Sequence, residues 1–139
     1  MVHALDEIRR ILVPDGILID LRPILDRWQI EFVSARESRA TGQMQGFPLG
    51  LADDEAANRS MRVAEENGWF KREQQEYFPY IYSWDSAGEM EKWIEDEWAG
   101  YIEPDEETKQ RTRSAWALGN ADSRVRVQVK MSIARWRKL

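Results

Sequence analysis

The sequence predicts an α/β fold of the α+β kind, in which helices pack on a small mixed β-sheet. Residues 124–136 alternate strictly between apolar and polar side chains, which is the period of a strand with one buried face. Residues 3–13 place apolar side chains at helical spacing instead. Gly, Pro and Asp residues separate these periodic segments, as turns require. A chain of 139 residues fits one domain, which we predict to span residues 1–139.

The chain opens with a helix, a tight turn and a strand. The helix over 3–13 should end at Pro14, and Asp15-Gly16 supplies the turn. A strand over 17–22 follows at once. Because neighbouring side chains of a strand point to opposite faces, its two faces are Ile17, Ile19 and Leu21 against Leu18, Asp20 and Arg22.

A β-hairpin and a helix come next. Residues 27–36 alternate well enough for a strand, and 41–49 form its expected partner, with 37–40 as the turn. The following helix covers 53–68. Its acidic residues crowd the expected first turn, as the helix dipole favours, and the glycine at its end fits a C-terminal stop.

A long strand, two helices and the alternating strand complete the chain. The long strand covers 69–84, where Pro79 indicates a bulge or an amide that faces away from a partner. The first helix begins with Ser86 and Glu89 at capping-box spacing, and the second spans 104–120 with proline at its first position. The last strand places five apolar side chains on one face: Val125, Val127, Val129, Met131 and Ile133.

Composition excludes several classes of protein. The chain has no cysteine, so disulfides, thiolate metal sites and cysteine nucleophiles are absent. Its net charge of −5 argues against binding to nucleic acid or to an anionic membrane, which usually needs a basic excess. No signal peptide and no apolar run long enough to span a membrane is visible. We therefore expect a cytoplasmic protein with no nucleic-acid or membrane partner.

The run RRILVPDG at residues 9–16, which leads into strand 17–22, carries a family resemblance. It resembles the R-x-L-x-P-G-G motif before the fifth strand of class I S-adenosylmethionine-dependent methyltransferases, with Asp15 where the family usually has Gly. NGWF at 67–70 is similar to the entry into the sixth strand, and the terminal strand looks like the seventh. The resemblance implies a three-stranded mixed core sheet in the family's order 5-7-6, with the hairpin over 27–49 as an insertion.

The cofactor-binding half of that family has no counterpart in this sequence. The family holds its cofactor with a Gly-rich turn after the first strand and with an acidic residue that ends the second. No E/D-x-G-x-G run and no NPPY-like segment is present, and the glycine pairs Gly42/Gly46 and Gly46/Gly50 lie in the predicted hairpin. We therefore predict no catalytic residue, no cofactor-binding residue and no metal ligand.

Three functions remain open. The first is a non-catalytic, methyltransferase-like module that dimerises and binds a protein partner or a small ligand. The second is the substrate-side component, or a truncated fragment, of an S-adenosylmethionine-dependent methyltransferase, with a separate protein supplying the cofactor-binding half. The third is a self-contained small-molecule binder unrelated to methyl transfer, because a fold does not fix a function.

The candidate ligand-facing surface is a polar sheet face. If the terminal strand pairs beside 17–22, five polar side chains fall on the same or adjacent faces: Asp20, Arg22, Arg126, Gln128 and Lys130. Arginines there offer bidentate geometry to an anionic ligand. The interpretation that we favour is cross-strand ion pairing with residues of the long strand, namely Arg72, Glu73 and Glu76.

Other candidates carry less chemistry. His3 is the only histidine and has no companions of a catalytic or metal-binding set. The carboxylate runs EEN, EDE and DEE fit solvated helix faces better than acid–base or metal sites. An aromatic run on the long strand is able to stack a planar ligand, although cross-strand packing is the commoner use of such residues: Tyr77, Phe78, Tyr80, Tyr82 and Trp84.

The strand over 17–22 also predicts an assembly. In the methyltransferase sheet the fifth strand pairs with the fourth, which has no counterpart here, so an apolar edge would be left exposed. Pairing of two copies about a twofold axis would cover it. We expect a homodimer through 17–22, with a continuous six-stranded core sheet. The hairpin over 27–49 is the competing cover, by folding back over this edge or by swapping to a partner.

Overall fold

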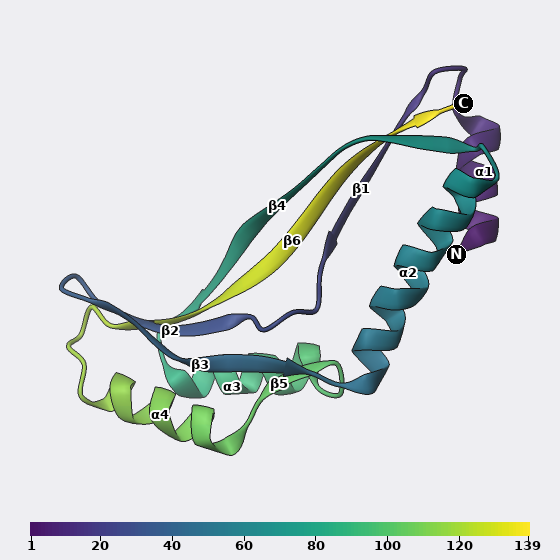
Figure 1. Ribbon diagram of the computed structural model, residues 1–139. Helices are drawn as coiled ribbons and strands as arrows, with labels where there is room; N and C mark the ends of the chain where they lie inside the picture. Colours follow the sequence, from purple (N-terminus) through teal and green to yellow (C-terminus); the bar gives the residue numbers. More distant parts are fainter. The chain divides into compact units, whose positions relative to one another are not determined.

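Six β-strands form an open antiparallel sheet and four α-helices accompany them, so the predicted α+β class is confirmed (Figure 1). The computed structural model describes residues 1–139. In chain order, the elements are α1 (Val2–Ile11), β1 (Ile17–Pro23), β2 (Gln29–Val33), β3 (Ser38–Gly46), α2 (Pro48–Glu66), β4 (Phe70–Trp84), α3 (Ala87–Trp93), the π-helical turn η1 (Ile94–Trp98), β5 (Ile102–Pro104), α4 (Glu106–Ala117) and β6 (Arg124–Lys138). None of the helices is long and apolar enough to cross a membrane.

The sheet is larger than the expected three-stranded mixed core. Its order is β1-β6-β2-β3-β5, and β4 also pairs with β6. β6 therefore lies between β1 and β4, which is the neighbour order expected for the 5-7-6 core. No parallel pair is present, because both outer strands of that group run antiparallel to β6 between them. The prediction of a mixed sheet is therefore not confirmed.

The chain folds into two compact units, which we describe separately. Unit 1 contains residues 1–24, 52–78 and 131–139, and unit 2 contains residues 25–51 and 79–130. The long strands β4 and β6 each contribute one half to each unit. The prediction of a single domain over 1–139 stays a prediction, because two units that share two strands are compatible with either description.

In unit 1, α1 and residues 52–66 of α2 pack with the sheet. The buried cluster that joins them draws on both helices, on the start of β4 and on the end of β6: Leu5, Met61, Ala64, Phe70, Ala134 and Trp136. The left-handed φ of Gly68, +66°, lets the chain leave α2 and enter β4 directly, which confirms the predicted stop. Trp69 donates its amide to the carbonyl of Ala64, 2.9 Å away, and so satisfies one of the last helical carbonyls.

The predicted turn before β1 is present and depends on an unusual backbone conformation. Asp15 has a φ of +61° and is the only non-glycine residue with a positive φ. Asp tolerates this left-handed region better than most residues. The amide of Gly16 closes the turn on the carbonyl of Val13 at 2.9 Å.

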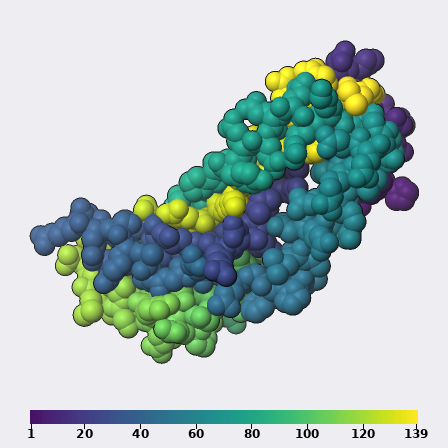
Figure 2. All heavy atoms as spheres, viewed as in Figure 1, coloured from purple at the N-terminus to yellow at the C-terminus, as the bar shows by residue number.

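In unit 2, α3 and α4 cover one face of the β2–β3 part of the sheet (Figure 1). The atoms of β3 and α4 lie directly against each other in Figure 2, where the blue and green regions meet. Strands β2, β3 and β6 supply large buried side chains to this core: Ile30, Phe32, Met44, Val125, Val127 and Val129. Ser86 caps α3 by accepting from the amide of Glu89 at 3.1 Å, as the capping-box spacing predicted.

The predicted hairpin exists, but it is not an insertion beside the sheet. β2 and β3 pair antiparallel around a turn in which the Ser34 amide donates to the Glu37 carbonyl at 2.8 Å. β2 also pairs with residues 124–128 of β6, and β3 pairs with β5. The hairpin is thus an integral part of the sheet, and β1 keeps β6 as its one neighbour.

Two helix starts differ from the prediction. α2 begins at Pro48, five residues before the predicted 53, so the acidic residues lie beyond its first turn. α4 begins at Glu106, because Pro104 belongs to the unpredicted strand β5 and Asp105 is the cap. The Asp105 side chain accepts from the Thr108 amide at 2.7 Å, and this hydrogen bond starts α4 later than proline would.

The single apolar face predicted for β6 is found only in unit 2. There Val125, Val127 and Val129 are buried, whereas Met131 and Ile133 are only half-buried. In unit 1 the buried residues of this strand are Ser132, Ala134 and Trp136. The face of β6 that is buried therefore changes along the strand.

Candidate binding surfaces

The five residues of the predicted polar face lie in two separate places. Asp20 and Arg22 belong to unit 1, where their side chains form an ion pair at 3.3 Å. Nη2 of Arg22 also donates to Oδ1 of Asn58 on α2 at 2.7 Å. This strand face is therefore turned toward α2, and the guanidinium holds β1 to that helix.

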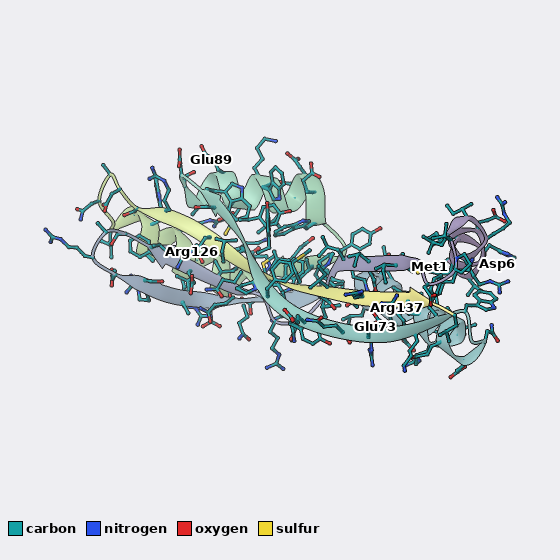
Figure 3. The ribbon with its side chains drawn as sticks, turned by 90° about the horizontal axis from the view of Figure 1, so that it is seen from above. Met1, Asp6, Glu73, Glu89, Arg126 and Arg137 are labelled. Carbon is teal, nitrogen blue, oxygen red and sulfur yellow. The ribbon has the colours of Figure 1, made fainter.

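The other three, Arg126, Gln128 and Lys130, lie in unit 2, where a buried carboxylate organises two of them. Glu31 is 6% exposed, and its Oε2 accepts from Nε of Arg126 at 2.7 Å. Its Oε1 accepts from the side-chain amides of Gln128 at 2.8 Å and of Gln29 at 2.6 Å. Lys130 pairs with Asp26 at 2.8 Å. Figure 3 shows Arg126 on β6.

This group of charges is neutral within itself. Burial raises the pKa of Glu31, but the hydrogen bonds from Gln128, Arg126 and Gln29 outweigh it, so the pKa lies below its ordinary value. The hydrogen bond from Lys130 lowers the pKa of Asp26 in the same way. Both carboxyl groups are ionised at neutral pH and balance the two cations. An anionic ligand would have to compete with Glu31 for Arg126, so the geometry is that of ion pairing.

Ion pairing was the interpretation that the sequence favoured, although its partners differ from those expected. Arg126 pairs with Glu31 of β2 and not with the long strand. Glu73, one of the expected partners, instead contacts Arg135 at 2.9 Å and Arg137, which lies beside it in Figure 3. A ligand-binding role for the five residues stays a prediction.

Glu31 is the residue that sequence reasoning missed. It stands between Ile30 and Phe32, both buried, in an alternating strand, so its side chain points to the opposite face from theirs. A carboxylate at the centre of a strand is a signal in itself, since charged side chains are seldom fully buried without a partner. That signal predicts a cation on a neighbouring strand, which is Arg126.

The glycines that might have suggested a cofactor loop make room for the chain itself. A Cβ on Gly42 would lie 2.4 Å from the side chain of Thr108, so the bare backbone lets α4 approach β3. A Cβ on Gly50 would lie 2.8 Å from the carbonyl oxygen of Tyr101. Both approaches are filled by protein atoms, so neither glycine opens space for a ligand.

The free edge of β1 carries two exposed apolar side chains. Ile19 is 52% and Leu21 is 55% exposed. The amide of Lys138 donates to the carbonyl of Gly16. Gly16 and Lys138 are therefore a hydrogen-bonded pair of the β1–β6 ladder. Because such pairs alternate along an antiparallel ladder, the backbone groups of Ile19 and Leu21 point away from β6, toward the free edge.

An aromatic cluster marks unit 2. Tyr82 and Trp84 of β4 stack at 5.9 Å between ring centroids and 14° between planes. Trp93 and Trp98, from α3 and η1, contact both of these rings at 5.1 to 6.3 Å. Tyr80 contacts Tyr82 at 5.2 Å. The aromatic run therefore packs along its own strand and against α3 and η1, while its outer rings remain exposed; cross-strand packing stays a prediction.

The remaining candidates lie on exposed surfaces. His3 is exposed on α1. No group of three or more His, Cys, Asp or Glu side chains lies close enough to hold a metal ion. Carboxylates of η1 and α4 form surface ion pairs, namely Asp96 with Lys92 at 2.6 Å and Glu107 with Arg111 at 3.1 Å, as expected of solvated helix faces.

Comparison with known proteins assigns no family. No protein-family model, no curated protein and no solved structure matches this chain.

Proposed function

We propose that this chain is a non-catalytic, methyltransferase-like module that self-associates through the free edge of β1. The observation that carries the proposal is that edge. β1 has one neighbour in the sheet, and the backbone groups of Ile19 and Leu21 point away from it. An exposed apolar edge with unpaired backbone groups is a ready template for another strand.

A second copy of the same strand can form hydrogen bonds with the outward backbone groups of this edge. A twofold axis at Asp20 sets Ile19 of one copy opposite Leu21 of the other, with their backbone groups facing each other. Both side chains then lie on one face of the joined sheet. Half-buried Ile133 stands opposite Leu21 on β6 and extends this apolar surface. The joined sheet would contain the six strands of each chain, instead of the six in total expected from the sequence.

The variant Leu21→Pro tests this proposal. Proline removes the outward amide of residue 21 but spares the β1–β6 ladder, since proline is tolerated where a strand's amide faces solvent. We expect the variant to elute as a monomer of 16.4 kDa with an unchanged far-UV circular dichroism spectrum, and the wild type to elute as a dimer. The matched control Leu21→Val keeps the amide and should stay dimeric. If Leu21→Pro remains dimeric, β1 is not the interface.

The relation to methyltransferases rests on two observations. β6 lies between β1 and β4, in the order of the family's fifth, seventh and sixth strands. The position where the family's motif usually has Gly is Asp15, and its φ of +61° is one that glycine adopts freely. The same observations favour a second candidate, in which the chain is the substrate-side component of such an enzyme and a separate protein holds the cofactor.

Thermal unfolding with S-adenosylmethionine tests whether this chain has a cofactor site of its own. We expect no change in the melting temperature of the chain at 1 mM cofactor, because no loop of it fits the group. A ligand that binds only the folded state at about 100 times its Kd stabilises that state by about 2.7 kcal/mol, which is easily detected. A clear, saturable rise in melting temperature would overturn the first candidate, because it would place a cofactor site on this chain itself. The same measurement with S-adenosylhomocysteine and with ATP provides the comparison ligands.

A further inference from the structure

The aromatic cluster of unit 2 presents a broad ring surface. Tyr80 is 53% and Trp93 is 39% exposed, and Tyr82, Trp84 and Trp98 are half-buried beside them. Because the rings contact one another at 5.1 to 6.3 Å, they enclose no cage. The cluster is a ledge and not a pocket for a small molecule.

The segment that carries two of these rings is strongly acidic. Residues 85–98 contain six carboxylates and a single basic residue, Lys92. Three of the carboxylates have cations of their own, in the pairs Lys92–Asp96, Arg113–Glu91 and Arg124–Asp85. Glu95 and Glu97 form no salt bridge, although both are exposed and lie within the ring-bearing turn η1. Negative charge therefore remains unbalanced beside exposed indole rings.

A cavity on the same turn adds further carboxylates. It has a volume of about 460 Å³ and is lined by Glu91, Ile94, Glu95, Ala99, Glu103 and Lys109. Three of these six residues are acidic. Its one cation, Lys109, is paired with Glu106 at 2.9 Å. A long basic side chain with an apolar stem matches such a lining of carboxylates around Ile94.

We propose that this aromatic and acidic surface binds a basic polypeptide segment, rich in arginine or lysine. Guanidinium groups stack on the faces of Trp and Tyr rings, where the ring quadrupole attracts them. The free carboxylates of Glu95 and Glu97 add electrostatic attraction and a hydrogen-bonded partner for each cation. An extended partner is favoured over a small cation, because the rings form a ledge. The inference uses residues of unit 2 alone, so it does not depend on association through β1.

Fluorescence anisotropy with labelled peptides tests the inference. The probe is a fluorescein-labelled (Arg-Gly)₆ peptide, and (Glu-Gly)₆ is its opposite in charge. We expect saturable binding of the basic peptide only, which weakens as salt rises because the attraction is partly between exposed charges. Trp93→Leu keeps the apolar bulk but removes the ring, and should weaken binding about three- to fivefold. In an NMR titration, the indole signals of Trp84 and Trp93 should shift, whereas those of Trp69 and Trp136 in unit 1 should not.

Two matched controls separate a site from general attraction to an acidic protein. Trp116→Leu removes an indole that is 38% exposed, nearly as much as Trp93, and that contacts no other ring; its one link to segment 85–98 is a hydrogen bond from Nε1 to the Asp85 carbonyl at 3.0 Å, so affinity should be unchanged. Glu95→Gln/Glu97→Gln should weaken binding more than Glu55→Gln/Glu66→Gln, which removes the same charge from α2 in unit 1. Binding that is unaffected by Trp93→Leu, equal losses in the two glutamine pairs, or displacement by choline at equal charge concentration would overturn the inference. Absence of binding at millimolar peptide would overturn it also.

Discussion

Phe70→Ala should lower the free energy of unfolding by about 3–5 kcal/mol, which is the usual cost of removing a buried aromatic ring. Phe70 is fully buried at the start of β4, and it packs in the cluster that joins α1, α2 and β6. The cavity left behind is bordered by separate elements, which have no simple way to collapse together. Because a small protein is stable by only about 5–15 kcal/mol, we expect a large shift of the urea midpoint, or loss of folding in unit 1.

Phe78→Ala is the matched control for this prediction. It makes the same chemical change on the same strand, but Phe78 is 38% exposed. Its loss should cost about 1 kcal/mol or less, as is typical of partly exposed positions. Urea unfolding followed by circular dichroism measures both values. Similar losses in the two variants would contradict the arrangement of the unit 1 core.

Glu31→Ala should cost about 2–4 kcal/mol, the second largest effect. Breaking a buried ion pair by removing one partner usually costs about 3–5 kcal/mol, because the other charge is left uncompensated. Arg126 has a side chain that is 32% exposed, so water would compensate it in part and reduce the loss. The amides of Gln29 and Gln128 would also lose their acceptor. Glu37→Ala, an exposed glutamate of the hairpin turn, is the control and should be nearly neutral.

The same carboxylate makes this loss depend on pH. The pKa of Glu31 is lower in the folded state than in the unfolded chain, so its contribution is complete above the ordinary pKa of a glutamate. The contribution is lost as the pH falls from there through the folded pKa. The difference in unfolding free energy between wild type and Glu31→Gln should be constant from pH 5 to 7 and should shrink toward pH 3. A difference that grows on acidification would contradict the assigned direction of the shift.

Local signals explain why much of the secondary structure was predicted correctly. The Ser86 cap, the left-handed Gly68 and the alternation of 124–136 each depend on neighbours in the sequence, and all three are found. The starts of α2 and α4 were predicted wrongly, because the local signals used to place them were not the ones that decide where each helix begins. At the start of α4, the Asp105 side chain caps the helix, although proline prefers the first helical position. Pro104 instead belongs to β5, which pairs with β3.

The arrangement of the sheet depends on distant contacts, which periodicity does not reveal. The alternation of apolar and polar residues shows that β6 has two unlike faces. It does not show that the buried face changes between the two halves of the strand. The polar face was predicted as one surface and is divided between the two units, because residues 17–23 pair with 131–137 and residues 29–33 pair with 124–128. Glu31 was missed because its partner Arg126 lies 95 positions further along the chain.

The mass of the wild-type chain in solution tests the central claim most directly, namely that the free edge of β1 joins two copies. Multi-angle light scattering during gel filtration, at loadings from about 1 to 100 µM, would give that mass. We predict twice 16.4 kDa over the upper part of this range, with Leu21→Pro at 16.4 kDa throughout. A wild-type mass of 16.4 kDa at every concentration would contradict the account.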